Sequence, residues 1–245
     1  LGQFSEIFKE YIKPKGSIVI EVGNSWTPGF PTFSLITLKS LINFLEQGKL
    51  KLAQEFVWYN PAKLPTPAAW VTIKRIRVKD SFTKIWWMSK SSYPKASNKK
   101  VLVSYSKKME QLIKNKRYNH GTRVSGHKIN KTSFLKQNKG AIPSNVLMPS
   151  NVLPFSNTAT SFNQKYLDYC NKKQLTPHPA LMQYQVVDFF INFLTNKNDL
   201  IMDPFAGSNT TGQIAESLSR KWVSIEKSKE YLKGSIGRFE NVIKT

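Results

Sequence analysis

Acidic residues are scarce in this chain of 245 residues, most of all in its middle. The sequence holds 37 lysines and arginines against 15 aspartates and glutamates, which gives a formal net charge of +22 at pH 7. Between Ser81 and Leu167 there are sixteen basic residues and a single acid, Glu110. So large and local an excess of positive charge indicates a polyanionic partner, with nucleic acid the leading candidate. The alternative is a generally basic composition without a binding role.

Cysteine, histidine and long apolar runs are also rare. The single cysteine, Cys170, excludes an intrachain disulfide, and His120, His127 and His178 are too scattered in the sequence for a zinc site. No run reaches the roughly 18 apolar residues that a membrane helix needs, and the N-terminus does not have the pattern of a secretory signal. These absences favour a cytoplasmic protein with no metal centre and no membrane association.

Helical and strand-like patterns alternate at both ends of the chain. Apolar periodicity predicts helices at about 4–12, 33–46, 183–194 and 210–219, and strands at 17–22, 52–59, 82–88, 200–202 and 222–226. Gly48 stands where the C-cap of the second helix is expected. Such alternation predicts an α/β fold with a mainly parallel sheet covered by helices. From Ser91 to Cys170 the periodicity fades and Lys, Ser, Asn and Gly dominate, which indicates an inserted region.

The sharpest motif is the segment DPFAGSNTTG at 203–212, between an apolar strand and the following helix. At that position a glycine lets a ligand approach the backbone, and the helix N-terminus offers N–H groups to an anion. A Walker phosphate loop is disfavoured because Gln213 replaces its essential lysine, and the dinucleotide pattern GxGxxG is absent. The segment therefore predicts a site for a nucleotide-like ligand, contacted by Asp203, Phe205, Gly207, Ser208, Asn209, Thr210 and Thr211.

Glu226 extends this predicted site. It follows Asp203 by 23 residues, at the end of the next predicted strand. An acid at about this separation accepts hydrogen bonds from ribose hydroxyls in related α/β folds. The alternative for Glu226 is a solvated charge beside Lys227.

Several segments carry a family resemblance. The stretches 203–212, 220–226 and 234–239 resemble the cofactor end of permuted, β-arrangement DNA amino-methyltransferases. The segments 56–65, 75–80, 85–90, 123–127 and 140–143 are similar to the PvuII-type N4-cytosine methyltransferases. The resemblance implies a circularly permuted, Rossmann-like class I methyltransferase sheet and S-adenosyl-L-methionine as cofactor. It also implies that His178 and Pro179 form a second cofactor motif, although composition alone would make His178 a helix-entry residue.

The same resemblance implies a division of the chain. Residues 1–90 are expected to form the catalytic-side half of the methyltransferase domain, 91–170 the DNA target-recognition region, and 171–245 the cofactor-binding half. Phosphate contacts position a protein on DNA, whereas base contacts specify sequence. The expected DNA-binding residues are Lys99, Lys100, Lys107, Lys108, Arg117, Arg123, Ser125, His127 and Lys128, of which Arg123, Ser125 and His127 are the candidates for base contacts. Trp58, Trp86 and Trp87 are candidates for base stacking, although tryptophans in strands more often belong to the core.

One family motif is missing. Such enzymes carry a catalytic loop, Ser/Asp/Asn-Pro-Pro-aromatic, ahead of the helix that corresponds to 4–12, yet no two prolines are adjacent in the 245 residues. The resemblance places that strand and loop beside the cofactor strand. We therefore expect no catalytic residue within these 245 residues, and expect the loop to come from a missing N-terminal segment or a separate chain.

The implied function is site-specific methylation of double-stranded DNA at the exocyclic N4 amine of cytosine, as part of a restriction-modification system. That amine is inaccessible inside the duplex, so the base must flip into a pocket beside the cofactor. Two alternatives stay open. One is an N6-adenine methyltransferase, and the other is a non-catalytic DNA- or cofactor-binding subunit of a split enzyme.

Overall fold

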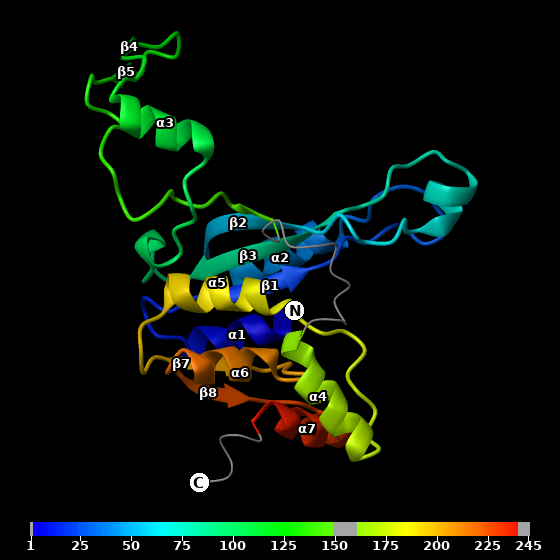
Figure 1. Cartoon of the computed structure of the whole chain (residues 1–245). Helices are drawn as coiled ribbons and strands as arrows, with labels where there is room; N and C mark the ends of the chain where they lie inside the picture. The colour runs from blue at the N-terminus through cyan, green and yellow to red at the C-terminus, as the bar shows by residue number, and fades with distance from the viewer. Residues whose placement is uncertain (1, 149–160, 240–245) are drawn as a thin grey trace. The chain divides into compact units, whose positions relative to one another are not determined.

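The chain forms two compact units in the computed structural model, which describes residues 2–148 and 161–239 (Figure 1). The larger unit is composed of residues 1–96 and 145–245, and the smaller unit of residues 97–144. The smaller unit is shorter than the predicted recognition region 91–170, because the helix α4 (Ser161–Lys172) belongs to the larger unit. The assignment of these regions to DNA recognition and cofactor binding stays a prediction.

The larger unit contains two sheets. The first has the strand order β1 (Ile18–Val22), β3 (Phe82–Ser89), β2 (Lys51–Tyr59), β6 (Val146–Leu147), and the second pairs β7 (Leu200–Asp203) with β8 (Lys221–Ser224). The pairs β7–β8 and β2–β6 are parallel, whereas β1–β3 and β2–β3 are antiparallel. The prediction of a mainly parallel sheet is therefore wrong, and the fold is mixed α/β. The physical reason is the connection from β2 to β3: residues 60–81 hold only a short π-helix, η1 (Ala69–Ile73), and no crossover helix.

Helices cover both faces of the first sheet. The chain has α1 (Gly2–Tyr11), α2 (Ile36–Gln47), α5 (Tyr184–Leu194), α6 (Thr210–Ser217) and α7 (Lys229–Ser235), besides α4. Trp87 packs with Phe190 of α5, and its neighbour Trp86 packs with Phe44 of α2. Successive residues of a strand face opposite sides of a sheet, so the two tryptophans enter two different cores. Both are buried, which makes core packing their role and removes them as candidates for base stacking.

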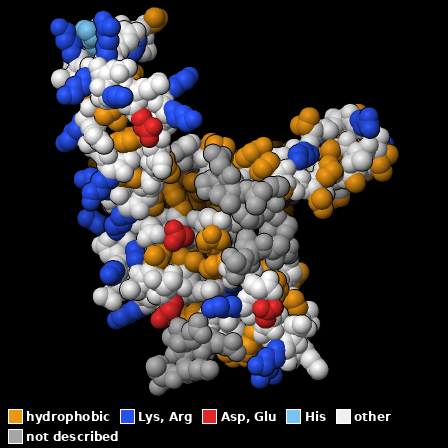
Figure 2. All heavy atoms as spheres, viewed as in Figure 1, with side chains coloured by type: hydrophobic (Ala, Val, Ile, Leu, Met, Phe, Trp, Pro, Cys, Tyr) orange, Lys and Arg blue, Asp and Glu red, His pale blue; other side chains and the backbone are white. Residues whose placement is uncertain are grey.

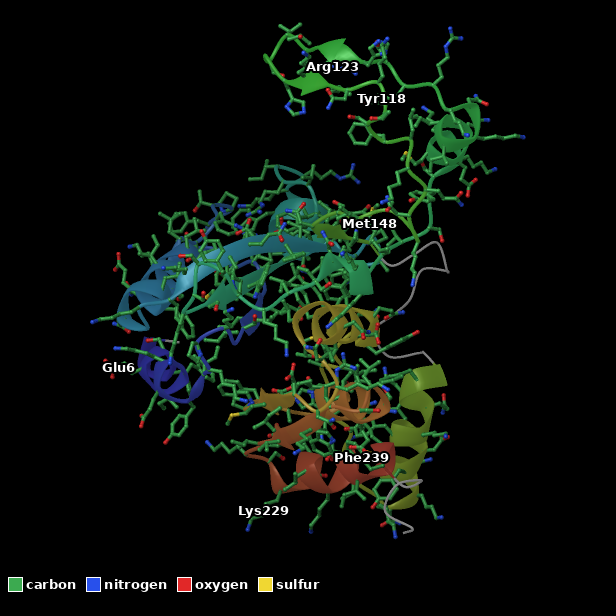
Figure 3. The ribbon with its side chains drawn as sticks, turned by 90° about the vertical axis from the view of Figure 1, so that its left-hand side faces the viewer. Glu6, Tyr118, Arg123, Met148, Lys229 and Phe239 are labelled. Atoms are coloured by element: carbon green, nitrogen blue, oxygen red, sulfur yellow. The ribbon has the colours of Figure 1, made fainter. Side chains whose placement is uncertain are left out.

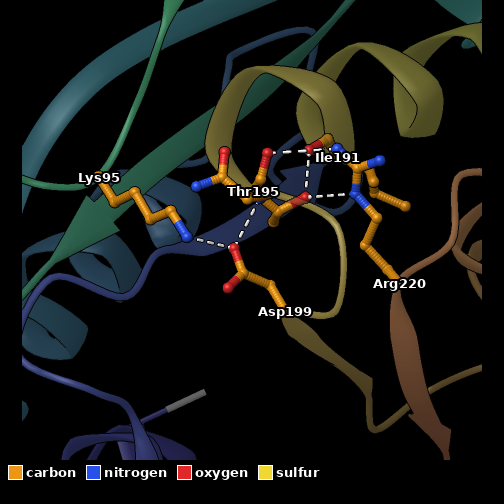
Figure 4. Close-up of polar contacts among 6 residues, drawn as sticks. Lys95, Ile191, Thr195, Asp199 and Arg220 are labelled. Atoms are coloured by element: carbon orange, nitrogen blue, oxygen red, sulfur yellow. Dashed lines mark hydrogen bonds and ion pairs between the residues drawn. The ribbon is translucent and has the colours of Figure 1, made fainter.

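Polar contacts fix the second sheet to the end of α5 (Figure 4). The guanidinium of Arg220 donates from Nε to Thr195 Oγ1 at 3.1 Å and from Nη2 to the Thr195 carbonyl at 3.2 Å. The ammonium of Lys95, which follows β3, forms an ion pair with Asp199, which precedes β7. These contacts lie at the end of the second sheet where β7 begins, away from the residues that follow its strands.

Most predicted elements are present, with end points shifted by a few residues. The helix α4 was missed, because its residues lie in the stretch that has little periodicity. Gly48 is the C-cap of α2 as predicted, but with φ −75°, while Lys49 takes the left-handed conformation at φ 47°. A Cβ on Gly48 would lie 2.9 Å from the Phe44 carbonyl oxygen, a backbone atom, so space requires the glycine. In the described part of the chain, no helix is long and apolar enough to cross a membrane.

Candidate functional site

The segment between β7 and α6 forms a tightly bonded loop, which is exposed at Phe205 and buried from Gly207 to Asn209. Asn209 is the N-cap of α6 and takes the left-handed conformation at φ 60°. Its Oδ1 accepts hydrogen bonds from the Gly212 amide at 3.0 Å and from Ser224 Oγ at 2.7 Å. A Cβ on Gly212 would lie 2.4 Å from that oxygen, so only glycine fits there. The amide hydrogen bond supplies one of the capping contacts that the first turn of a helix needs. The Asn209 and Gln213 amides donate to backbone carbonyls, so the N–H groups of Thr210 and Thr211 are the ones that a ligand could use.

Two carboxylates hold the ends of this loop. Asp203 accepts hydrogen bonds from the Phe205 amide at 3.0 Å and from Thr211 Oγ1 at 2.6 Å. Glu226 accepts from the amides of Ser228 and Gly207, each at 2.8 Å. The amide of Ser228, and to a smaller extent that of Gly207, lowers the pKa of Glu226 below its usual value. Glu226 is therefore ionised at neutral pH, and its oxygens keep lone pairs that can accept further hydrogen bonds.

The second predicted motif lies directly against the first. A Cβ placed on Gly207 would be 3.1 Å from His178 Nε2, and Gly207 has φ +53°. The His178 ring makes an edge-on contact with Tyr231 at 4.7 Å between centroids. The backbone N–H of His178 donates to Tyr166 Oη at 2.8 Å. Packing therefore brings residues 178 and 207 together although 29 positions separate them in the sequence.

A pocket opens where these segments meet. It is lined by Glu21, Trp58, His178, Ala180, Leu181, Met182, Gln183, Asp203, Phe205, Ala206, Gly207, Ser208, Thr210 and Thr211. Of the predicted cofactor residues, Pro179, Asn209 and Glu226 are not in this lining. Pro179 is exposed beside it, Asn209 is buried as the helix cap, and Glu226 reaches the loop through the Gly207 amide.

The wall formed by the first sheet was largely missed. Glu21 lies on β1 and Trp58 on β2, and both face the pocket. Burial raises the pKa of Glu21, partly offset by the charge of Lys63. The signal for Glu21 was an acid in an otherwise apolar strand. Trp58 was considered for base stacking, and it both lines the pocket and packs in the core with Phe56.

The smaller unit carries the predicted DNA-binding residues. It contains η2 (Asn98–Lys100), α3 (Lys107–Asn115) and a hairpin of β4 (Gly121–Thr122) and β5 (Lys128–Ile129). All nine predicted residues lie in this unit: Lys99, Lys100, Lys107, Lys108, Arg117, Arg123, Ser125, His127 and Lys128. Eight are exposed, and Arg123 is half-buried. Twelve basic residues and one acid, Glu110, make the unit strongly positive, as the blue side chains around α3 and the hairpin in Figure 2 show.

The hairpin brings the three candidate base-contacting residues to one turn. The Arg123 amide donates to the His127 carbonyl at 2.8 Å, and the Gly126 amide donates to the Arg123 carbonyl at 2.8 Å. Gly126 has φ +78°, a conformation that favours glycine. The Arg123 guanidinium donates to the Asn119 carbonyl at 2.9 Å, which explains its partial burial near Tyr118 (Figure 3). Ser125 and His127 are exposed at this turn.

The sequence of the chain is similar to those of known proteins over most of its length. A family model named N6_N4_Mtase and described as DNA methylase matches residues 1–237. The type II methyltransferase M.PvuII of Proteus hauseri is 41% identical over 238 residues, which are 96% of this chain and 68% of that protein. The DNA adenine methyltransferase YhdJ of Escherichia coli K12 is 36% identical over 63 residues, 26% of this chain and 21% of that protein.

Solved structures show a similar arrangement. A structure titled PvuII DNA methyltransferase (cytosine-N4-specific) matches with a TM-score of 0.73 and 34% identity, over 97% of this chain and 68% of the other. A complex titled M1.HpyAVI-SAM matches with a TM-score of 0.55 and 18% identity, over 98% of this chain and 81% of the other, and supports the fold alone.

Gly207 gives a direct test of the loop geometry. We expect Gly207→Ala to lower the free energy of unfolding by about 1 to 3 kcal/mol, because it forces a side chain into the left-handed conformation against His178. Urea denaturation measures the loss. The matched control is Gly23→Ala, since a Cβ there meets no atom within 4 Å and its φ is not left-handed. An equal effect of both substitutions would contradict the role assigned to the φ of Gly207.

Proposed function

Because the chain belongs to the N6/N4 DNA methylase family, we propose that it acts in the transfer of a methyl group from S-adenosylmethionine to N4 of cytosine in duplex DNA. One observation carries the proposal: His178 and residues 180–183 line a single pocket with residues of the 203–211 loop, in a chain of which 96% aligns with M.PvuII. A place in a type II restriction-modification system is part of the proposal.

The pocket residues fit this cofactor. Gly207 has no side chain to block approach to the backbone, and the hydroxyls of Thr210 and Thr211 lie beside the first N–H groups of α6. Glu226, ionised and next to the Gly207 amide, is placed to accept hydrogen bonds from ribose hydroxyls. His178 and Pro179 border the same site. When bound, the cofactor supplies an electrophilic sulfonium methyl group.

The target base requires space beside this site. Flipping a cytosine out of the duplex costs a few kcal/mol, which contacts in the pocket and on the phosphates must offset. Trp58 is 8% exposed and packs mainly in the core, but unlike Trp86 and Trp87 it also lines the pocket, so its pocket-facing part is the candidate for an aromatic contact with the base. The lysines and arginines of the smaller unit are suited to hold DNA phosphates, and Arg123, Ser125 and His127 are suited to contact bases at the hairpin turn.

The catalytic loop is proposed to lie between the two sheets. Among the described residues, β1 pairs only with β3, and β7 pairs only with β8, so each strand has one open edge. A strand ending in a Pro-Pro-aromatic loop, supplied by another segment or another chain, fits between them in the permuted family arrangement. Its oxygen atoms would accept the N–H hydrogens of the amine and hold the nitrogen in line with the methyl group.

N6-adenine methylation is the second candidate, because it shares the fold, the cofactor and base flipping. The similarity to the adenine methyltransferase YhdJ covers 26% of the chain, whereas the similarity to M.PvuII covers 96% of it. That difference favours cytosine. A non-catalytic subunit is the third reading, and product analysis separates all three.

Product analysis tests the proposed function. We expect the natural gene product that contains these residues, given labelled S-adenosylmethionine and mixed-sequence duplex DNA, to yield labelled N4-methyldeoxycytidine by mass spectrometry of the nucleosides. The 245 residues alone should bind cofactor but transfer no methyl group, because they contain no Pro-Pro-aromatic loop. Label in N6-methyldeoxyadenosine would replace the cytosine assignment. Transfer by the 245 residues alone would show that the catalytic groups lie among them.

Glu226 tests the cofactor site. Replacing Glu226 with alanine should weaken S-adenosylmethionine binding by about 1 to 3 kcal/mol, because ribose hydroxyls lose their acceptor. Calorimetric titration measures the change. Glu46→Ala, on the exposed face of α2, serves as control. Unchanged affinity in the Glu226 variant would remove this residue from the site.

Salt dependence tests the smaller unit. Replacing Lys99, Lys100, Lys107 and Lys108 with alanine should flatten the slope of log K against log salt by roughly 0.9 for each lost phosphate contact on duplex DNA. Fluorescence anisotropy across a salt series gives the slope. The charge-matched control replaces four exposed lysines of the larger unit, Lys172, Lys173, Lys227 and Lys229. Weaker binding with an unchanged slope would mean that the four lysines act through folding.

A further inference from the structure

We propose that Arg238 is a positioning residue. Its buried positive charge lies behind the Gly207–Thr210 loop and makes that loop prefer a ligand that carries a carboxylate. The ligand group is the amino-acid carboxylate of the cofactor, its single anionic group, so the inference rests on the proposed function. Arg238 lies behind the loop and acts through it, without lining the pocket itself.

Arg238 is joined to the loop by short hydrogen bonds. Its side chain is 8% exposed, although arginine is seldom buried. Nε donates to the Ser208 carbonyl at 2.6 Å, and Nη2 donates to Ser208 Oγ at 3.0 Å. Nη1 donates to Gln213 Oε1 on α6 at 2.7 Å, and Nη2 donates to Asn163 Oδ1 on α4 at 2.9 Å. The guanidinium thereby fixes both the loop and the first turns of α6.

The charge of Arg238 has no carboxylate partner among the described residues. Its acceptors among the described residues are all neutral oxygens, and its guanidinium also lies over the rings of Phe162 and Tyr166, at 5.4 and 4.7 Å from their centroids. Burial lowers the pKa of Arg238 to about 10, which still leaves the group charged at neutral pH. A buried cation held only by dipoles keeps a positive potential around it, and the N-terminus of α6 adds to that potential.

Neither of the two acids that bind the loop forms a close pair with Arg238, whose pKa responds to burial, Tyr166 and Cys170. Asp203 is bonded to Phe205 and Thr211, and Glu226 to Gly207 and Ser228. Ser208 lies between those bonded positions, and it is the residue whose carbonyl and hydroxyl Arg238 binds. At an effective dielectric constant of about 20, a unit charge about 12 Å away changes the affinity for an anion by on the order of tenfold, and a nearer charge changes it more.

The chain is built to bring Arg238 to this position. A Cβ on Gly237 would lie 2.5 Å from the Tyr169 Cβ, so glycine lets the segment before Arg238 approach α4. Tyr166, one turn from Asn163 on α4, accepts the His178 amide hydrogen. One face of α4 therefore supports both parts of the candidate cofactor site.

The test compares two ligands that differ by one carboxylate, S-adenosylmethionine and its decarboxylated form, by calorimetric titration of the protein. Asn163→Asp gives Arg238 an anionic partner without removing any of its hydrogen bonds. We expect the parent protein to prefer the carboxylated ligand and Asn163→Asp to reduce that preference by on the order of tenfold. The matched control, Asn171→Asp, adds the same charge at an exposed position of α4 and should leave the preference unchanged.

Two further variants keep the test decisive if Asn163→Asp does not fold. Arg238→Lys keeps the charge and should keep the preference, even if both ligands bind more weakly, whereas Arg238→Gln should lose it. Loss of preference in the lysine variant, or an unchanged preference in Asn163→Asp or the glutamine variant, would overturn the inference alone. Failure of the parent protein to bind either ligand would overturn the proposed function as well.

Discussion

The arrangement of the larger unit depends on the packing of α5 between its two sheets. Phe190 and Leu194 of α5 pack on Phe56 and Trp87 of the first sheet. Ile191, on another side of the same helix, packs with residues of α6 and with partly buried side chains of β7 and β8. Because β1 and β7 are not paired within the described residues, this apolar contact sets the distance between the sheets. The loop that precedes α5 lines the pocket, so the same packing also places His178.

The candidate cofactor site has a rigid backbone and also keeps hydrogen-bonding groups that a ligand can use. Its backbone is fixed by Asn209, Asp203, Glu226 and Arg238, which lie around the loop and meet it through short hydrogen bonds. Such a loop loses little conformational entropy when a ligand binds, because its conformation is already fixed. The carboxylates keep free lone pairs and the start of α6 keeps N–H groups for a ligand. Preorganisation of this kind suits the proposed methyl transfer, whose rate depends on holding the reacting atoms in line.

The candidate cofactor loop could be predicted from local patterns in the sequence, whereas the other pocket residues could not, because tertiary packing alone brings them there. Asp203 through Gly212 could be predicted because strand, glycine and helix start are adjacent in the chain. Glu21 and Trp58 could not be assigned to the pocket, since only the packing of the first sheet brings them there. The parallel sheet was predicted wrongly because alternating patterns do not reveal whether a connection crosses over. Helix α4 was missed because its buried positions are not all apolar: Tyr166 and Cys170 pack in a core, whereas Asn163 accepts a hydrogen bond from Arg238.

The smaller unit is stabilised in a different way, and this affects how it can bind DNA. Of its residues only Gly140 is buried, and its aromatic contact is between Tyr118 and Phe134, at 4.9 Å between centroids. Twelve cations repel one another in a body with so little apolar packing. Phosphates would relieve that repulsion, so the DNA binding that we propose for this unit is expected to stabilise its bound conformation. The candidate cofactor site is thus ordered by internal hydrogen bonds, whereas the smaller unit is expected to gain order from the DNA that we propose it binds.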